Sequence, residues 1–337
     1  MANRMTIRYE KITDRKPSMH ALNFKDVISS SPLIFTLGVA GDSGSGKTTF
    51  TQAIRQIFGE DLVSTITLDD YHCYDREQRR QLHITPLAPE ANDLQRLERD
   101  LVALKKGETI RKPVYNHRTG QLDPPIPFSP KKILILEGLH TFFTPVLREL
   151  LDFKLFVDPD RPVKREWKIK RDIEVRGYQE TEVLDELAER ENDYQEYIAP
   201  QRWYADAIIR ISHSKYGETL GRERNVYQVA LLQSKLLRAV EDTDLSIDLL
   251  SLLSMSERDF LLEFQRQTLD GRGWGTLTFD GELNYALIRK LERNVERQTG
   301  VHPIDIYTHR SYVVAGEIAQ LILAWRIINR RIFIGRE

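Results

Sequence analysis

Residues 41–48 read GDSGSGKT and fit the pattern G-x-x-x-x-G-K-[ST], which restricts the fold of this chain more than any other feature. The apolar residues 33–40 before them are typical of a short buried strand, and residues 49–58 repeat apolar side chains on one helical face. A glycine-rich turn between such a strand and helix directs backbone N–H groups and the positive end of the helix dipole at one point. The pattern therefore predicts a loop that binds the phosphates of a nucleotide.

Each part of this loop has an expected role in binding ATP and Mg²⁺. Lys47 would reach the β- and γ-phosphates, and the Thr48 hydroxyl would coordinate Mg²⁺. The glycines permit the tight turn and the close approach of the backbone to an anion. A chance glycine-rich turn is the alternative, and the strand and helix on its two sides argue against it. The residues expected to contact ATP are Gly41, Asp42, Ser43, Gly44, Ser45, Gly46, Lys47, Thr48 and Thr49.

The composition indicates a globular protein with balanced charge. Its 337 residues are 41% hydrophobic, enough for a sizeable core, and the length suits two domains or one large domain with an appended part. With 49 Lys and Arg against 50 Asp and Glu the net charge is −1, so nucleic acid is not an expected partner. The single cysteine, Cys73, excludes an intrachain disulfide and a cysteine-based metal site, and it points to a reducing compartment.

The sequence suggests neither secretion nor a membrane span. Residues 1–20 contain no apolar run that resembles a signal peptide. The most apolar late stretch, residues 312–334, is too polar to cross a bilayer because it is interrupted by Glu317, Gln320, Arg326 and Arg330. We therefore expect a cytoplasmic protein in which this stretch is a buried or interface helix.

The middle of the chain alternates strands with helices. Apolar strands are expected at residues 62–68, 132–136, 153–157 and 207–211, and amphipathic helices at residues 93–106, 161–176 and 181–198. This alternation predicts an α/β fold with a mainly parallel sheet covered by helices on both faces. Residues 111–130 are rich in Pro, Asn, Asp and Gly, so they are expected to form a loop.

The last third of the chain has a different pattern. Helices are predicted at residues 225–242 and 257–269, followed by a short strand at residues 276–279. Asp280-Gly281 comes next and is a hairpin-turn signal. The predicted organisation is an N-terminal arm or edge element at residues 1–31, a core at residues 32–215, and a helical and hairpin extension at residues 216–337 that packs on the core.

Two strand ends carry acids suited to phosphoryl transfer, which needs a carboxylate to accept the nucleophile's proton and groups that hold Mg²⁺. Asp69 and Asp70 follow one strand, where alternation of side chains would turn only one of them to the site. Glu137 ends the next strand and resembles the acid on the metal side of nucleotide-binding sheets. An ordinary strand-end turn, or a helix cap for the aspartates, is the alternative interpretation.

Six segments occur in the order and approximate spacing found in phosphoribulokinases, so the chain resembles that family of P-loop, nucleoside-kinase-like enzymes. They are residues 41–48, 68–76 (LDDYHCYDR), 113–125 (PVYNHRTGQLDPP), 136–140 (LEGLH), 167–177 (WKIKRDIEVRG) and 204–209 (YADAII). The resemblance spans about residues 33–213 and is weaker around residues 277–303. Uridine kinases share the loop, the strand-end Asp, the Glu-Gly pair and the Arg-Asp helix, whereas the Asp-Tyr-His and Tyr-Asn-His-x-Thr-Gly segments favour phosphoribulokinase.

The resemblance implies ATP-dependent phosphorylation of ribulose 5-phosphate to ribulose 1,5-bisphosphate. Asp69 then corresponds to the general base, and Thr48 and Glu137 to the side that holds Mg²⁺. Taken locally, either histidine of the matched segments could be a hydrogen-bonded loop residue, and the tyrosine a half-buried anchor. The positions that match contacts to the sugar phosphate are His72, Arg76, Tyr115, His117 and Arg176.

Residues 167–177 are expected to form a lid that brings cations to the transferring phosphate. On a helix, Lys168, Arg171 and Asp172 lie at i, i+3 and i+4 and share a face. A solvated charged helix is the local alternative. The similarity to the family favours the lid, which adds these three residues to Lys47 and Asp69 in the expected catalytic set.

The departures from plant-type and cyanobacterial relatives concern thiol control. Those enzymes resemble GDSGCGKS in the loop and carry a cysteine before Leu-Asp-Asp-Tyr-His, whereas this chain has Ser45 and Thr67. The resemblance therefore implies an enzyme without dithiol regulation. We expect a homodimer, with residues 312–334 as its interface or as a buried core helix. A uridine kinase or other small-metabolite kinase is the nearest alternative function, and a nucleotide-binding regulatory protein is a more distant one.

Overall fold

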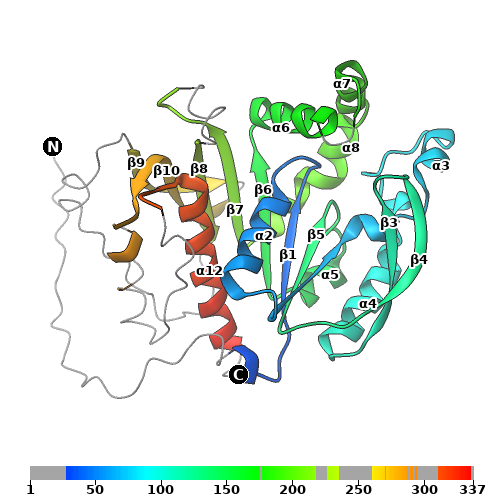
Figure 1. The fold of residues 1–337 in the computed structure, drawn as a ribbon, viewed down its shortest axis with the longest axis horizontal. Coiled ribbons are helices and arrows are strands. Elements are labelled where there is room, and N and C mark those ends of the chain that lie inside the picture. Colours follow the sequence, from blue (N-terminus) through cyan, green and yellow to red (C-terminus); the bar gives the residue numbers. More distant parts are fainter. Residues whose placement is uncertain are drawn as a thin grey trace.

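The computed structural model describes residues 28–174, 177–217, 226–234, 260–269, 271–286, 288–290, 293 and 310–334. These residues form a nine-stranded sheet in the order β11-β10-β8-β7-β6-β1-β5-β2, with β9 paired to β10, and a separate two-stranded sheet (Figure 1). The parallel half contains β1 (Phe35–Gly41), β2 (Val63–Thr67), β5 (Ile133–Gly138), β6 (Phe153–Pro159) and β7 (Ala207–His213). The antiparallel half contains β8 (Tyr227–Ser234), β9 (Phe260–Leu269), β10 (Arg272–Asn284) and β11 (Tyr312–Val314).

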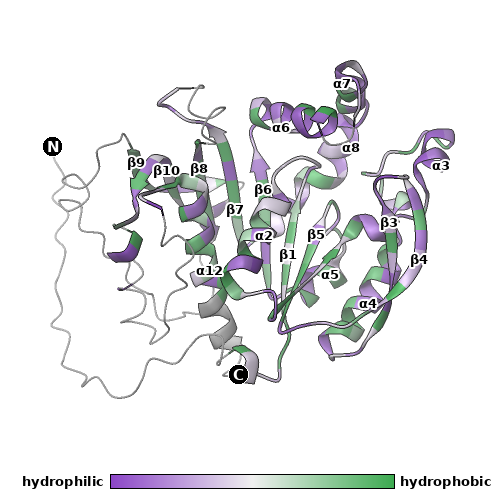
Figure 2. Cartoon of the chain, viewed as in Figure 1, coloured by the Kyte–Doolittle hydropathy of each residue, from purple (hydrophilic) through white to green (hydrophobic). Residues whose placement is uncertain are grey.

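Side chains alternate between the two faces of the sheet, so each face has its own core. Leu37 and Val39 of β1 share an apolar cluster with α2 (Lys47–Phe58) and α12 (Ala315–Ile334). Ala40 belongs to the cluster on the other face, with α4 (Leu94–Lys105). Figure 2 shows the central strands in green and much of the outer helical surface in purple. The predicted α/β fold, with parallel core strands and helices on both faces, is confirmed.

β1 lies in the middle of the parallel half, between β5 and β6. In register, Val39 of β1 lies beside Glu137 of β5, and Glu137 lies beside Thr67 of β2. The carboxyl ends of these three strands therefore meet at one edge, which is where ligands bind in open α/β sheets. This edge brings the loop that follows β1, the acid that ends β5 and the turn that follows β2 next to one another.

Residues 111–130, expected to be a loop, form a β-hairpin instead. β3 (Ile110–Asn116) pairs antiparallel with β4 (Gln121–Phe128), and the register shifts between Lys112 and Val114. The prolines that suggested a loop are tolerated because β4 is an exposed edge strand, where a missing N–H removes no hydrogen bond from a central ladder. The hairpin contacts the turn after β2 and so becomes a wall of the site.

The helices after β6 begin as predicted and then change character. α6 (Arg161–Glu174) and α7 (Glu180–Glu189) are followed by α8 (Glu191–Asp193), a π-helical turn (Tyr194–Ile198) and a 3₁₀ turn (Ala199–Tyr204). The single helix expected at residues 181–198 is therefore divided. The π turn directs Tyr194 and Ile198 into a small apolar cluster with Leu87 and Leu139.

The helices predicted beyond residue 216 are wrong for the residues that the structure describes there. Residues 227–234 form β8, and residues 260–269 form β9. Both extend the sheet from β7, where cross-strand hydrogen bonds and packing override local preference. The chain turns into β10 at Gly271, whose φ is 76°, whereas Asp280-Gly281, expected to be the turn, lies within β10.

Over its described side chains, α12 is a core helix. Ile318, Leu321, Leu323 and Ile327 are buried in the cluster that also contains residues of α2, β8 and β10. Of the two interpretations of residues 312–334, the buried helix is therefore the one that these side chains support. Among the described helices, none is both long and apolar enough to cross a bilayer.

Candidate active site

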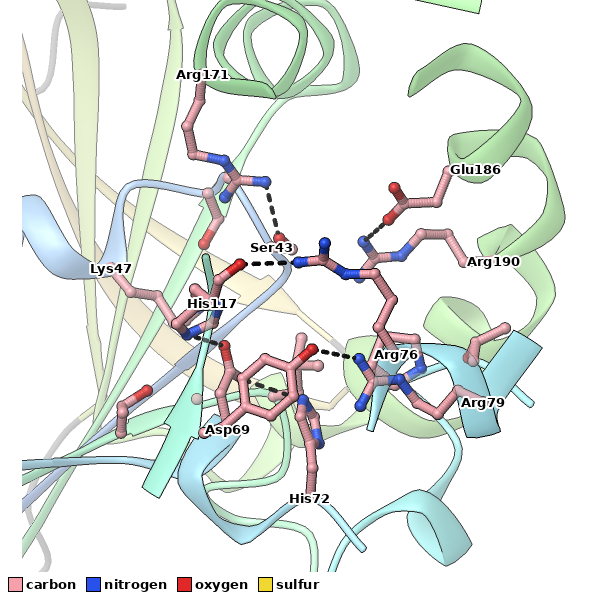
Figure 3. A pocket seen from close by; sticks show the side chains of 18 of the residues that line it. Ser43, Lys47, Asp69, His72, Arg76, Arg79, His117, Arg171, Glu186 and Arg190 are labelled. Carbon is pink, nitrogen blue, oxygen red and sulfur yellow. Dashed lines mark hydrogen bonds and ion pairs between the residues drawn. The ribbon is translucent and has the colours of Figure 1, made fainter. Parts of the chain in front are cut away.

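A cavity of about 1260 Å³ opens at the carboxyl ends of the parallel strands. Residues 43–49 of the phosphate loop form one side of it. The other sides come from the turn after β2, α3 (Arg76–Gln81), the β3–β4 hairpin, α6 and α7 (Figure 3). Side chains far apart in the sequence, including Lys47, Asp69 and Arg171, therefore face the same space.

The phosphate loop has a backbone suited to a polyphosphate. Gly44 and Gly46 have φ values of 78° and 89°, in the left-handed region that favours glycine. A Cβ on Gly44 would lie 3.2 Å from Lys168 Cβ, and one on Gly46 would lie 3.0 Å from the Trp167 ring, so a side chain would crowd both neighbours. α2 begins at Lys47 without a side-chain cap, which leaves the positive end of the helix open to an anion.

Lys47 lies between the acids that the sequence singled out. Its ammonium group donates to the backbone oxygens of Gly41, at 3.0 Å, and Asp42, at 2.6 Å. Burial lowers the pKa of Lys47, while the charges of Glu137, Asp42 and Asp69 act in the opposite direction. The cation is thus surrounded by loop carbonyls and by one carboxylate from each of two neighbouring strand ends.

Glu137 is held by hydroxyl groups of α2. Thr51 Oγ1 donates to Glu137 Oε2 at 2.5 Å, and Thr48 Oγ1 donates to Oε1 at 3.2 Å. A hydroxyl and a carboxylate are hard oxygen donors of the kind that Mg²⁺ combines with phosphate oxygens and water. In the described ranges, no group of three His, Cys, Asp or Glu side chains could hold a metal ion by themselves. These residues therefore fit a Mg²⁺ ion that arrives with a nucleotide.

The two aspartates after β2 face different ways. They lie in a 3₁₀ turn (Leu68–Tyr71), labelled η1 hereafter, in which Asp69 lines the cavity and Asp70 is only 5% exposed, beneath the hairpin. Only one of the two faces the cavity, as expected. The reason differs from the one expected, because β2 ends at Thr67 and the 3₁₀ turn, rather than strand alternation, separates the two carboxylates.

Two histidines flank Asp69. His117 Nε2 lies 3.4 Å from Asp69 Oδ2, and His72 Nε2 lies 4.0 Å from Oδ1. His72 Nδ1 is 2.8 Å from Asn92 Oδ1, and since the Asn92 amide nitrogen donates to two backbone carbonyls, the ring nitrogen is the donor in this contact. Burial lowers the pKa of His72 against the opposing charge of Asp69. Neutral His72 therefore presents a bare Nε2 that can accept a hydrogen bond from a substrate hydroxyl.

Tyr115 and two arginines complete this side of the cavity. The Tyr115 ring makes edge-to-face contacts with His72 and His117, with centroids 5.0 and 5.1 Å apart. Arg79 donates to the Tyr115 hydroxyl at 2.9 Å, and Arg76 donates to the backbone oxygen of His117 at 2.8 Å. The structure thus brings His72, His117, Arg76 and Arg79 together near Asp69 (Figure 3).

The face of α6 expected to act as a lid is divided between two tasks. Arg171 lines the cavity and donates to Ser43 Oγ of the phosphate loop at 3.1 Å. Lys168 is 1% exposed and pairs with Asp172 at 2.7 Å and with Glu186 of α7 at 3.2 Å. Burial would raise the pKa of Asp172, but Lys168 and Arg171 outweigh it, so the pKa is lowered. Lys168 thus joins α6 to α7 through Glu186, whereas Arg171 reaches the loop.

Asp42 joins the phosphate loop to the helices above it. Its carboxylate binds Arg190 at 2.9 Å and Lys164 at 3.0 Å, and all three residues are buried. Burial alone would raise the pKa of Asp42, but the two cations lower it. The Asp42 side chain is not among those that line the cavity. It therefore anchors the loop, while its backbone oxygen accepts a hydrogen bond from Lys47.

Two walls of the cavity carry opposite charges. The arginines of one wall recur at i, i+3 and i+4 and the acids of the other at i, i+3, i+4 and i+7, so each of these two sets lies on one helical face. A phosphorylated acceptor would be drawn to the basic wall and repelled by the acidic one. The basic wall, on and just after α3, is formed by Arg76, Arg79, Arg80 and His83, and the acidic wall, on α7, by Glu182, Asp185, Glu186 and Glu189.

Several residues at the site carried little signal in the sequence. Arg79 lies one helical turn after Arg76, and that spacing is the clue that could have found it. Arg190 and Lys164 lie more than 100 residues from Asp42, and no local pattern marks them. Arg176, expected to contact the substrate, lies outside the described residues.

The strand, phosphate loop, helix and clustered acids define a P-loop protein built for phosphoryl transfer. The model of the phosphoribulokinase/uridine kinase family matches residues 36–215, more than half of the chain, and the chain belongs to this family.

The similar proteins include both branches of the family. A phosphoribulokinase of Synechocystis sp. is 40% identical over 202 residues, 60% of each chain. The chloroplastic phosphoribulokinase of Arabidopsis thaliana is 38% identical over 205 residues, 56% of this chain and 52% of that protein. A uridine kinase of Ligilactobacillus salivarius is 34% identical over 181 residues, 51% of this chain and 83% of that protein. The matches thus span 60% or less of these two phosphoribulokinases. The solved phosphoribulokinase from Rhodobacter spheroides is 20% identical, with a TM-score of 0.49, and covers 88% of this chain and 100% of that one.

Proposed function

We propose that the protein acts as a phosphoribulokinase, which transfers the γ-phosphoryl group of MgATP to ribulose 5-phosphate. The observation that carries the proposal is the position of Asp69, which shares a cavity with the phosphate loop, acts electrostatically on Lys47 and lies between two histidines. A carboxylate at this position can accept the proton of a hydroxyl that attacks a phosphate held by the loop.

In the proposed reaction, Asp69 takes the proton of the acceptor hydroxyl while the hydroxyl oxygen forms a bond to the γ-phosphorus. The bond from that phosphorus to the bridging oxygen breaks, and ADP leaves with the electron pair. Lys47 and the loop N–H groups hold the phosphates, and Arg171 adds positive charge where the phosphoryl group passes. Mg²⁺ held by Thr48 and Glu137 would neutralise charge on the β- and γ-phosphates.

The acceptor is proposed from the relatives and from the charge of the site. The matched phosphoribulokinases are 38–40% identical to this chain, against 34% for the uridine kinase. The basic wall suits the phosphate of a sugar phosphate better than an uncharged nucleoside. His72, Arg76, Tyr115 and His117 would contact the sugar phosphate, and Arg176 remains a predicted contact.

An ADP-release assay with MgATP and four acceptors tests the proposal: ribulose 5-phosphate, uridine, cytidine and pantothenate. We expect the highest kcat/KM with ribulose 5-phosphate. Faster turnover of uridine would overturn the acceptor but not the nucleotide site. Failure of all four acceptors to stimulate ADP release would count against a kinase and favour the regulatory alternative. Light scattering after size-exclusion chromatography tests the expected homodimer, for which the buried α12 offers no argument.

A further inference from the structure

A buried ion pair joins the β3–β4 hairpin to the turn that carries Asp69. Asp70 and Lys112 are 5% and 8% exposed, and Lys112 Nζ pairs with Asp70 Oδ2. Asp70 Oδ1 accepts the backbone N–H of Tyr115 at 2.9 Å, and Lys112 Nζ also donates to the backbone oxygen of Pro113 at 3.2 Å. Both oxygens of this carboxylate therefore bind the hairpin.

An irregularity in the pairing of β3 with β4 accompanies this arrangement. Lys112 and Tyr115 are three residues apart, so in a regular strand their side chains would point to opposite faces. The register shifts between Lys112 and Val114, where two residue steps of β3 face three of β4, and the Lys112 and Tyr115 side chains are both buried. β-Bulges re-aim side chains in this way. The Lys112 ammonium group and the Tyr115 backbone N–H, one on each side of this irregularity, both reach the Asp70 carboxylate.

The ends of one short segment are held by adjacent aspartates. Asp70 binds the N–H of Tyr115, and Asp69 lies 3.4 Å from His117, two residues further along. Within the described chain, β3 and β4 pair with each other and not with the main sheet. No strand pairing with the main sheet therefore positions this segment relative to the Asp69 turn, and the buried contacts of Asp70 join the two directly.

We propose that Asp70 and Lys112 are positioning residues, which fix the hairpin so that Tyr115 and His117 stand at a set distance from the base. The inference rests on the proposed function in one respect, the role of Asp69 as that base. An ion pair of this kind contributes little net stability over apolar side chains, but removal of one partner leaves an unpaired buried charge. The Asp70–Lys112 pair therefore favours a single docked position of the hairpin over alternatives that would separate the two charges.

Three variants test the pair: Asp70→Asn, Lys112→Met and the double variant. Asn at position 70 can still accept the Tyr115 N–H, and the double variant leaves no unpaired charge, so it should fold even where a single variant does not. We expect each folded variant to lose about 10- to 100-fold in kcat/KM for the acceptor, because small misplacements of reacting groups are costly, with KM for ATP unchanged. The loss of kcat/KM in the double variant should not exceed the loss in the less active of the two single variants, as expected for coupled partners.

Lys105→Met is the matched control, since it also breaks a lysine–aspartate pair, with Asp152 at 3.2 Å, away from the cavity. It should lower thermal stability without raising KM for the acceptor. Equal rises in KM for ATP and acceptor, or losses in the double variant that multiply as if independent, would overturn the proposal.

The acceptor in this test is whichever compound wild-type protein phosphorylates fastest, so failure of ribulose 5-phosphate alone leaves the test intact. Hydrogen–deuterium exchange gives a readout that does not depend on turnover. Residues 110–128 should exchange faster in Lys112→Met than in wild type, while residues 41–49 should not. Unchanged exchange of the hairpin would contradict the positioning role.

Discussion

The phosphate loop and the acceptor side of the cavity lie at the same edge of the sheet, yet they draw on different stretches of chain. The loop side uses the consecutive residues 41–49, from the end of β1 to the first turn of α2, and much of what it offers an anion is backbone. The acceptor side takes Asp69 from the turn after β2, Arg76 from α3, and Tyr115 and His117 from a hairpin outside the main sheet. The first side is local in sequence, and the second exists only once the hairpin has docked.

Both sides nevertheless use a buried aspartate as an anchor next to the groups that face the cavity. Asp42 binds Lys164 and Arg190 beside the phosphate loop, and Asp70 binds Lys112 beside Asp69. On each side, therefore, some residues face the cavity while a neighbouring aspartate attaches their segment to the rest of the protein. Substitutions on the loop side should therefore affect nucleotide binding, and those on the acceptor side should leave it intact.

Asp69→Asn should give the largest effect and is confined to the acceptor side. General base catalysis contributes about 10² to 10⁴ in rate, so we expect kcat to fall by that factor while the Kd for ATP stays nearly constant. Asp70→Asn is not a neutral control, because Asp70 is buried against Lys112. The exposed Glu77→Gln on α3 serves instead. A variant Asp69→Asn that retains wild-type kcat would remove Asp69 from the role of base.

Lys47→Met should give the next largest effect and is the loop-side counterpart. Lys47 meets charge already present in ground-state ATP as well as in the transition state, so turnover and nucleotide affinity should fall together. Removal of one charge-stabilising donor costs about 10² to 10³ in kcat. Isothermal titration with ATP and steady-state kinetics measure both, with the exposed Lys106→Met as control. Intact ATP affinity would show that the two sides are less distinct than we infer.

His140 follows the strand that carries Glu137, and Asp69 and His72 of the acceptor side act on it electrostatically. Burial, followed by the charge of His72, lowers the pKa of His140 to about 4. The pKa of His140 is lower in the folded state than in the unfolded state, so the unfolded chain binds more protons between about pH 4 and 6.5. The free energy of unfolding therefore decreases as the pH falls through this window. Between pH 7 and 5 this costs about 2 kcal/mol.

His140→Asn should remove this contribution, so urea unfolding at pH 7 and pH 5 should show a smaller difference for the variant than for wild type. The comparison uses the change with pH, so any loss of packing common to both pH values cancels. An identical pH dependence in both proteins would mean that His140 does not titrate abnormally in the folded state.

Redox treatment should have the smallest effect. The one cysteine, Cys73, follows His72 on the acceptor side, and burial together with the charge of Asp93 raises the pKa of its thiol, which keeps it protonated and weakly reactive. Turnover should change by less than about twofold between reducing and oxidising buffers, and Cys73→Ser should behave like wild type. A reversible dithiol-dependent switch in monomeric protein would contradict this prediction.

The parallel core and the phosphate loop were predictable because their signals are short-range. A run of apolar residues, three glycines and an amphipathic helix follow one another within residues 33–58, so their arrangement hardly depends on the rest of the chain. The divergence of Asp69 and Asp70 was predicted with the wrong cause. Strand alternation is also a local rule, but the strand ends at Thr67 and the 3₁₀ turn takes over.

The hairpin and the antiparallel half were not predictable in the same way. Residues 111–130 carry prolines that read as a loop, and they form strands because an exposed edge tolerates a missing donor. Residues 227–234 form a strand because they lie between β7 and β10, whose hydrogen bonds a helix would forgo. In both cases the position of the strand in its sheet, at an exposed edge or between two other strands, decides the outcome.

By itself, the sequence determined the strand–loop–helix unit, the acids at the strand ends and the resemblance that named an expected activity, because each of these is written in consecutive residues. Tertiary structure alone decided which aspartate faces the cavity, that Lys112 and Tyr115 meet Asp70, and that Arg190 holds Asp42. The physical reason is that a buried charge is stable only with a partner, and in this chain those partners come from elements that folding, not sequence, brings together.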